Sequence, residues 1–153
     1  MTDAVKVISR NRKAFHEYEI SERFEAGLVL MGSEIKSIRG NRVNLGEGFV
    51  VERGNELWLM HVHIAPYAFA EAYGHSDPMR PRKLLLHRRE ISKVRTWIRE
   101  NTYTAVPISL YLKNGRAKVE IGLARGKKLY DKRNTIAERD SNRQIQRALK
   151  ENY

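Results

Sequence analysis

The fold is decided by residues 108–123, which read ISLYLKNGRAKVEIGL. Apolar residues alternate with other residues on both sides of Asn114-Gly115, as in two antiparallel strands joined by a tight turn. Asn and Gly readily adopt the left-handed backbone that such a turn requires. The side chains predicted to face the core are Ile108, Leu110 and Leu112 on the first strand and Ala117, Val119, Ile121 and Leu123 on the second. The chain is therefore expected to contain an antiparallel β-sheet.

Further strand patterns precede this hairpin, at residues 17–20, 24–31, 49–51 and 56–64. Residues 21–23 are expected to turn the chain between the first two strands, and Arg53-Gly54-Asn55 between the last two. Within residues 56–64 the alternation predicts that one face is buried. This face consists of Trp58, Met60, Val62 and Ile64.

Helical patterns are fewer. Residues 33–39 are expected to form a short helix that ends at Gly40, and residues 88–100 a longer one. Residues 73–83 contain glycine and proline and are expected to form a loop. About six strands with few helices predict a mainly β fold. The architecture expected is a small closed OB-like antiparallel β-barrel, spanning residues 1–125, with two or three flanking helices.

Residues 126–153 have a different character and are expected to form a basic C-terminal tail. Their only large aliphatic side chains are Leu129, Ile136, Ile145 and Leu149. Such a segment buries too little apolar surface to fold alone, so we expect it to be disordered when free. Arg139, Arg143 and Arg147 recur every four residues, which would place them on one stripe of a helix. The tail is therefore expected to become helical on a partner.

The net charge points to a polyanion. Lys and Arg total 29 against 18 Asp and Glu, which gives a formal net charge of +11 and a pI of about 10.1. Neutralising phosphates releases counterions and adds affinity, so nucleic acid is the expected partner, with a solubility surface as the alternative. The basic clusters lie beside aromatic residues, an arrangement suited to single-stranded or looped RNA. They comprise Arg10, Arg12 and Lys13 before Phe15, His16 and Tyr18; Lys36 and Arg39; Arg80, Arg82 and Lys83; and Lys127, Lys128, Lys132 and Arg133 around Tyr130.

Motifs for catalysis are weak. Residues 122–128 look like a phosphate loop, but one residue is missing between the glycines and Lys128 stands where Ser or Thr should bind magnesium. His61 and His63 alternate in a predicted strand, yet no third metal ligand follows at a suitable spacing. We expect no enzyme activity, catalytic residue, metal or cofactor; a metal-dependent nuclease using these histidines and a carboxylate is the alternative. There is no Cys, no signal-peptide pattern and no apolar run of membrane-spanning length, so a cytoplasmic protein without membrane contact is expected.

Several motifs occur together in one order. They are Asn11 with His16-Glu17-Tyr18, Phe24-Glu25-Ala26-Gly27, Gly32-x-Glu34-Ile35-Lys36-Ser37-Ile38-Arg39, Ile64-Ala65-Pro66-Tyr67, Asp77-Pro78-x-Arg80-x-Arg82-Lys83-Leu84-Leu85-Leu86 and Gly126-Lys127-Lys128-x-Tyr130-Asp131-Lys132-Arg133. Through them the sequence, from Asn11 to about Arg139, resembles the small protein B family, the SsrA-RNA-binding proteins of bacterial trans-translation. The resemblance implies an OB-like barrel that binds the tRNA-like domain of transfer-messenger RNA (tmRNA). It also implies that the protein stands in for the missing anticodon arm and that its tail enters the empty mRNA channel of a stalled ribosome.

The resemblance assigns roles by position. Asn11, Glu25 and Leu85 match family positions tied to RNA binding, while Lys36, Arg39, Lys83 and Lys118 are expected phosphate contacts by their charge. The complete RNA-binding set expected is Asn11, Arg12, Lys13, His16, Glu25, Lys36, Arg39, Lys83, Leu85, Lys118, Lys127 and Lys128. The ribosome-binding set expected, facing small-subunit rRNA, is Tyr130, Asp131, Lys132, Arg133, Arg139, Arg143 and Arg147. A monomer is expected.

Alternatives remain at two of these positions and for the function. Leu85 could belong to the core, and Glu25 could pair with an arginine. The protein could also be a general ribosomal or single-strand RNA-binding OB protein.

Overall fold

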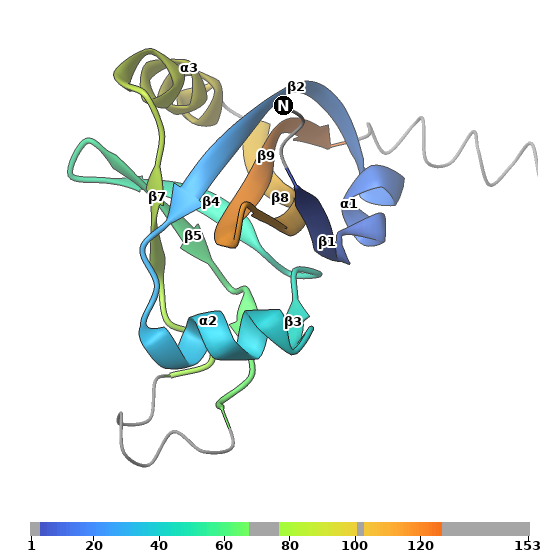
Figure 1. Cartoon of the computed structure of the whole chain (residues 1–153). Helices are drawn as coiled ribbons and strands as arrows, with labels where there is room; N and C mark the ends of the chain where they lie inside the picture. The colour runs from blue at the N-terminus through green and yellow to red at the C-terminus, as the bar shows by residue number, and fades with distance from the viewer. Residues whose placement is uncertain (1–3, 68–76, 101–102, 127–153) are drawn as a thin grey trace, which may run out of the picture.

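The computed structural model describes residues 4–67, 77–100 and 103–126 of the chain (Figure 1). Its strands are β1 (Val5–Arg10), β2 (Tyr18–Leu28), β3 (Val43–Asn44), β4 (Phe49–Arg53), β5 (Glu56–Met60), β6 (His63–Ile64), β7 (Arg82–Leu85), β8 (Tyr103–Lys113) and β9 (Arg116–Gly126). Its helices are α1 (Arg12–Glu17), α2 (Gly32–Arg39) and α3 (Arg88–Arg99). Lys127, Lys128 and the whole expected ribosome-binding set lie outside the described residues.

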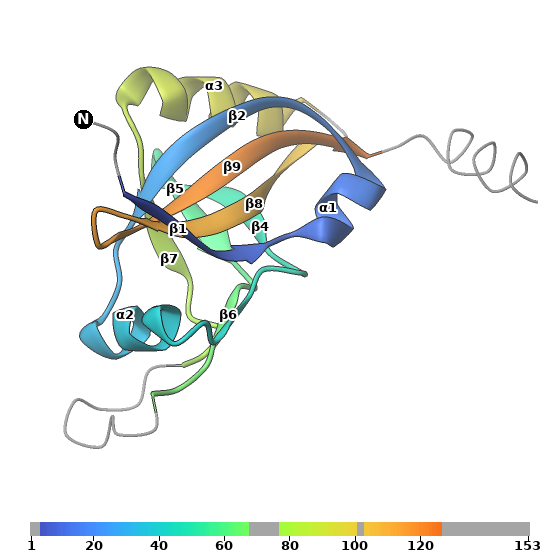
Figure 2. The ribbon, with the colours of Figure 1, turned by 45° about the vertical axis from the view of Figure 1, so that its right-hand side comes forward.

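One antiparallel sheet of seven strands dominates the fold, in the order β1-β8-β9-β2-β7-β5-β4. The sheet bends so that β4 contacts β8 across the core, while β3 and β6 form a separate small ladder. Figure 2 shows α2 and α3 at opposite ends of the sheet, with α1 beside the end of β1. The mainly β prediction is confirmed. Among the described residues the pairing order is linear, with β1 and β4 at its edges, so a closed barrel is not observed.

The hairpin of residues 108–123 is confirmed. β8 and β9 pair along their length and meet at Asn114 and Gly115, whose φ angles of 51° and 80° are the left-handed values expected of this turn. Ile108 is the exception to the predicted face. A bulge between Pro107 and Ser109 shifts the alternation, and Ile108, although buried, is not part of the main core cluster. That cluster includes Leu110, Val119, Ile121 and Leu123, with Leu112 and Ala117 packed against it.

The predicted buried face of residues 56–64 is wrong in its first half. Leu57 and Leu59 are the buried residues of β5, whereas Trp58 and Met60 are only half-buried. The strand ends at Met60, and His61 has a left-handed φ of 57°. This one residue shifts the alternation, so that Val62 and Ile64 are buried as predicted. The alternation in the sequence continues through His61, but the backbone kinks there, so the pattern does not give the buried face of β5.

The N-terminal third also departs from prediction. β2 is one continuous strand, and residues 21–23 lie at a bulge rather than at a turn. Glu17 ends α1 instead of beginning a strand, and neither α1 nor β1 was predicted. The predicted helices at residues 33–39 and 88–100 are confirmed as α2 and α3, with ends that differ by one residue.

A buried ion pair fastens α2 to the sheet. Arg82 was predicted to lie in an RNA-binding loop, but it is the first residue of β7 and is fully buried. Its Nε donates to Oε2 of Glu34 at 2.7 Å, and its Nη2 lies 2.6 Å from the same oxygen. The guanidinium also donates to the carbonyls of Val62 and Pro78. Arg80 donates to the other oxygen of Glu34. The predicted basic cluster at residues 80–83 therefore has two different roles. Its two arginines bind the buried Glu34, and only Lys83 does not take part in this ion pair.

The electrostatics of Glu34 agree with this structural role. Burial alone would raise the pKa of the Glu34 carboxyl. Hydrogen bonds from Arg80, from the backbone N–H of Met31 and from Arg82 more than offset burial, and they lower that pKa below its usual value. Burial lowers the pKa of Arg82 in turn. The carboxylate is thus ionised, and it binds the fully buried Arg82 and the partly exposed Arg80 at the same time.

Candidate functional site

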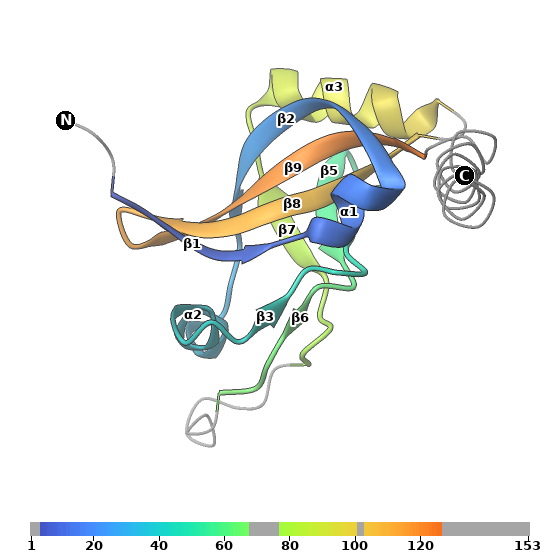
Figure 3. The same ribbon diagram turned by 90° about the vertical axis from the view of Figure 1, so that its right-hand side faces the viewer.

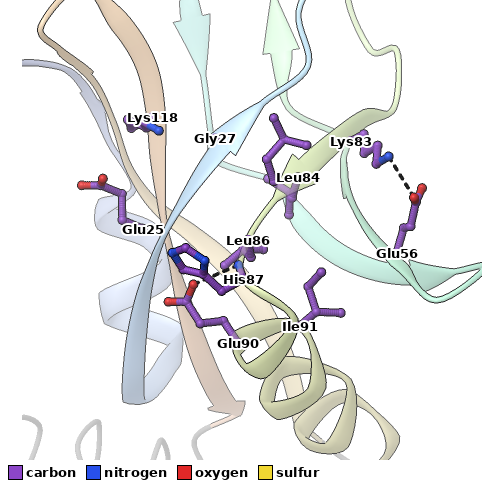
Figure 4. A pocket seen from close by; sticks show the side chains of 11 residues that line it. Glu25, Gly27, Glu56, Lys83, Leu84, Leu86, His87, Glu90, Ile91 and Lys118 are labelled. Atoms are coloured by element: carbon purple, nitrogen blue, oxygen red, sulfur yellow. Dashed lines mark hydrogen bonds and ion pairs between the residues drawn. The ribbon is translucent and has the colours of Figure 1, made fainter.

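A groove of about 490 Å³ runs along the outer side of β7, between β2, β9 and the start of α3 (Figure 4). We call it the β7 groove. It is lined by Glu25, Gly27, Glu56, Lys83, Leu84, Leu85, Leu86, His87, Glu90, Ile91 and Lys118. Four of the residues predicted to bind RNA meet here: Glu25, Lys83, Leu85 and Lys118. They come from three strands and are far apart in the sequence, so the fold brings them together.

Gly27 opens the floor of this groove. It pairs with Leu85 of β7 on one side and with Lys118 of β9 on the other. A Cβ atom at Gly27 would lie 3.3 Å from the Cβ of Leu85 and 3.7 Å from the Nζ of Lys118. The absence of a side chain therefore leaves space between an apolar and a cationic residue. Sequence reasoning did not select Gly27, although it lies in the Phe24-Glu25-Ala26-Gly27 motif.

Leu85 is an outward-facing residue. Its neighbour Leu84 is buried in the core, whereas Leu85 is 50% exposed. Strand alternation explains the difference, because successive side chains of β7 point to opposite faces of the sheet. The alternative that Leu85 belongs to the core is wrong, and an exposed leucine in a groove is available for apolar contact with a ligand.

Glu25 is held in place by two side chains of β8. The hydroxyl of Tyr111 donates to Oε2 of Glu25 at 2.5 Å, and the Nζ of Lys113 lies 3.3 Å from Oε1. The Tyr111 hydroxyl, followed by Lys113, lowers the pKa of the Glu25 carboxyl despite the opposing effect of burial. Burial raises the pKa of Tyr111, so its hydroxyl remains a donor at neutral pH. The partners of Glu25 are thus a tyrosine and a lysine rather than the arginine considered from the sequence.

The cations of the groove are accessible at its rim. The Nζ of Lys83 lies 2.8 Å from Oε1 of Glu56, and the two side chains are 35% and 44% exposed. Such a pair at the surface is weak and can be exchanged for a phosphate contact. Lys118 lies across Gly27 from Leu85, on the neighbouring strand β9. The groove therefore presents two lysines, three carboxylates and one exposed leucine; of the carboxylates, Glu56 is the partner of Lys83.

The remaining predicted RNA-binding residues lie elsewhere. Arg12, Lys13 and His16 are exposed on α1, which lies at the right of Figure 1, away from β7 at the left. Lys13 is paired with Glu47. Lys36 and Arg39 are exposed on α2, and the Nζ of Lys36 lies 5.3 Å from the ring centre of Tyr67. These residues form two further basic regions separate from the β7 groove.

Asn11 has an interior position. It is 3% exposed, and its Nδ2 donates to the carbonyls of Pro107 and Leu45 at 2.9 and 3.3 Å. Its Oδ1 accepts from the N–H of Ala14 at 3.1 Å and thereby caps α1. Asn11 thus connects the end of β1 with β8 and α1. A substitution of Asn11 would therefore affect RNA binding through the position of α1.

The two histidines considered as metal ligands do not share a strand. β5 ends before His61, and His63 begins the short strand β6. Within residues 4–67, 77–100 and 103–126, no group of three or more His, Cys, Asp or Glu side chains could hold a metal ion. In the same ranges, no helix has the length and apolar character needed to cross a membrane.

The comparisons with known proteins agree on one family. A family model described as SmpB protein matches residues 8–151. The chain belongs to the SmpB family. The SsrA-binding protein of Roseiflexus sp. (strain RS-1) is 58% identical over 149 residues, which cover 97% of this chain and 94% of the relative. The SsrA-binding protein of Thermosynechococcus vestitus is 51% identical over 151 residues, which cover 99% of each chain.

A solved structure also matches this SmpB-family chain. It is described as "tmRNA-SmpB: a journey to the center of the bacterial ribosome". The two chains superpose with a TM-score of 0.67 at 43% sequence identity, covering 79% of this chain and 85% of the other. The family implied by the sequence motifs is confirmed.

Proposed function

We propose that this protein binds tmRNA through the β7 groove and acts with it on stalled ribosomes. The observation that carries the proposal is the convergence of Glu25, Lys83, Leu85 and Lys118 on one groove in an SmpB-family chain. The names of its relatives, SsrA-binding proteins, and of the tmRNA-SmpB structure support the choice of RNA.

The chemistry of the groove suits a folded RNA better than a generic polyanion. Lys83 and Lys118 can contact phosphates, which gives affinity without sequence information. The Glu25 carboxylate repels phosphates but accepts hydrogen bonds from base amino groups or 2′-hydroxyls. Leu85 offers an apolar surface to an unstacked base or sugar. A ligand must therefore present donors and an apolar edge between two phosphates, as the loops of a tRNA-like domain do.

The proposal includes the finer architecture expected from the sequence. The bent sheet, in which β4 contacts β8, is an OB-like barrel spanning residues 1–125, and residues 126–153 are a separate tail. The tail, through Tyr130-Asp131-Lys132-Arg133 and the Arg139, Arg143 and Arg147 stripe, engages small-subunit rRNA in the empty mRNA channel. The body then occupies the place of the missing anticodon arm. We propose an adaptor that performs no chemistry itself.

A competition experiment tests the RNA partner. Labelled tmRNA is titrated with the full-length protein in the presence of a large excess of bulk tRNA, at several salt concentrations. We expect tmRNA binding to persist, because specific protein–nucleic acid complexes are typically at least about 10³-fold tighter than non-specific ones. Equal competition by bulk tRNA would instead identify a general RNA-binding protein.

A truncation tests the division of labour between body and tail. A chain lacking residues 131–153 is expected to retain tmRNA binding but to lose tagging of stalled nascent chains in a reconstituted translation system. Tagging by the truncated chain would show that the tail mechanism is wrong.

A further inference from the structure

A second groove lies on the same outer face of the sheet, along β1. It has a volume of about 500 Å³. This 500 Å³ depression, which we call the β1 groove, contains Val5 and Val7 of β1 and Phe15 of α1. These three side chains are 54%, 43% and 43% exposed. They form an apolar surface that nothing in the described residues covers.

A planar cation lies over the aromatic ring in this groove. The guanidinium carbon of Arg23 is 5.3 Å from the ring centre of Phe15. The Nη1 of Arg23 also lies 3.3 Å from Oε1 of Glu120, while the Arg23 side chain remains 54% exposed. The guanidinium is thus held between a ring and a carboxylate, with part of it open to solvent. Aromatic rings and guanidinium planes are the two protein surfaces on which unpaired RNA bases stack.

The β1 groove adjoins the β7 groove. Glu25 lines both of them, and Tyr111 and Lys113, which hold Glu25, belong to the lining of the β1 groove. The charged residues of the β1 groove are Arg10, Arg23 and Lys113 against Glu25 and Glu120, so cations outnumber carboxylates. An RNA strand that contacts Glu25 from the β7 groove would therefore continue onto a cationic surface with an apolar floor.

We propose that the β1 groove binds one unpaired nucleobase of the RNA held in the β7 groove, stacked on the Phe15–Arg23 pair. The proposal rests on the proposed RNA-binding function and extends its footprint from β7 to β1. Arg23 supplies the stacking plane, Phe15 supports it from below, and Val5 and Val7 contact the edge of the base. RNA is favoured over a protein segment because the groove combines a planar cation with excess positive charge and is continuous with Glu25.

The test separates the planarity of Arg23 from its charge. Arg23→Lys keeps the charge but removes the plane, and Phe15→Leu keeps apolar bulk but removes the ring. Affinity of each full-length variant for tmRNA is measured at fixed salt. Each is expected to bind on the order of tenfold more weakly, since stacking of one base contributes an effect of this size. The double variant should be little weaker than either single variant, because both changes remove the same stack.

The controls use the same kinds of substitution elsewhere. Arg99→Lys, on α3 and paired with Glu52, should bind tmRNA as the unchanged protein does. Ultraviolet cross-linking of the unchanged complex, followed by mass spectrometry, should give a nucleotide adduct on the peptide that contains Phe15. Thermal unfolding checks that each variant is folded. If Phe15→Leu does not fold, Arg23→Lys still tests the proposal, because the Arg23 side chain is exposed and its replacement is not expected to affect folding.

Three outcomes are decisive. If Arg23→Lys and Phe15→Leu bind within twofold of the unchanged protein while Leu85→Glu abolishes binding, the base site is wrong and the proposed RNA function stands. If Leu85→Glu also leaves binding unchanged, the proposed function itself is wrong. If sedimentation shows a dimer that Phe15→Leu dissociates, the β1 groove is instead a contact between two copies of the chain.

Discussion

The two faces of β7 carry neighbouring basic residues that have opposite uses. Arg82 points inward, is fully buried and is bound to Glu34 and to two backbone carbonyls. Lys83, the next residue, points outward and makes one ion pair with Glu56 at the rim of the β7 groove. In the sequence both belong to a single basic cluster.

The difference shows that burial decides what a positive charge can do. Removing a guanidinium from water is so costly that Arg82 must satisfy its donors inside the protein, and it then has none to offer a phosphate. A rim lysine keeps most of its hydration, and its ion pair contributes only about 0–1 kcal/mol. Arg82 therefore serves the stability of the fold and Lys83 is available for a ligand.

The largest effect is expected from breaking the inward pair. Arg82→Met leaves the Glu34 carboxylate buried with Arg80 as its remaining cation, and loss of one partner of a buried pair costs about 3–5 kcal/mol. Urea unfolding should show this decrease in the free energy of unfolding. The matched control is Lys83→Met, one residue along the same strand, which should change stability by about 0.5 kcal/mol or less. Equal destabilisation by both variants would contradict the division between the two faces.

The next effect concerns RNA affinity rather than stability. Lys118→Gln removes a cation from the β7 groove and should weaken tmRNA binding about tenfold, since a hydrogen bond to a charged group contributes about 1.5 kcal/mol or more. It should also reduce the slope of log affinity against log salt by about 1. Lys93→Gln is the control, because Lys93 lies on α3 and pairs with Glu22. An unchanged salt slope for Lys118→Gln would remove this lysine from the phosphate contacts.

Much of this fold follows from local patterns. The hairpin around Asn114-Gly115 was predicted because its alternation and its turn residues agree. α2 and α3 were predicted because helical spacing is unaffected by neighbouring strands. β1 was missed because only Ile8 of its apolar side chains packs against the core, whereas Val5 and Val7 face a groove on the surface and remain exposed. The kink at His61 was not predicted, because it lies between β5, which pairs with β4 and β7, and β6, which pairs with β3, and a local pattern does not show that the two segments join different ladders.

The site was predicted in its residues but not in its arrangement. Charge and family motifs selected Glu25, Lys83, Leu85 and Lys118, yet no local pattern tells which strands will be neighbours. Tyr111 was missed because the hairpin prediction considered only the core face of β8. The sequence did contain a signal for it, because an aromatic residue at an outward position of a strand indicates a contact outside the core. For Tyr111 this contact is with Glu25.

A smaller effect is expected at Tyr111. Tyr111→Phe removes the hydroxyl that lowers the pKa of Glu25, so this pKa should rise toward its usual value, as NMR titration of the carboxyl would show. Because the folded-state pKa is depressed, the stabilising contribution of Glu25 is present at neutral pH and is lost as pH falls through that pKa. The variant should lose less stability on acidification. Its tmRNA affinity should fall about fivefold, since a hydrogen bond contributes about 1 kcal/mol.

The control for this prediction is Tyr18→Phe, whose ring packs against Ala14, Val106 and Ala124 away from the β7 groove. Neither the pKa of Glu25 nor tmRNA binding should change in that variant. If Tyr111→Phe raises the pKa of Glu25 but leaves tmRNA affinity unaltered, the position of this carboxylate does not matter for RNA binding.

The smallest effect is expected at Gly27, where stability and binding should change independently. Gly27→Ala adds a methyl group 3.3 Å from the Cβ of Leu85, so Leu85 must move by a few tenths of an ångström. Replacing glycine in extended backbone also restricts the unfolded chain, which stabilises by about 0.4–1 kcal/mol and offsets the crowding. Stability should therefore change little, while tmRNA affinity falls by about 0.6 kcal/mol, or about threefold. Gly32→Ala, at a position with open space, is the control. Unchanged affinity with Gly27→Ala would mean that the opening between Leu85 and Lys118 is not part of the RNA footprint, and the outward face of β7 would then bind through charge alone.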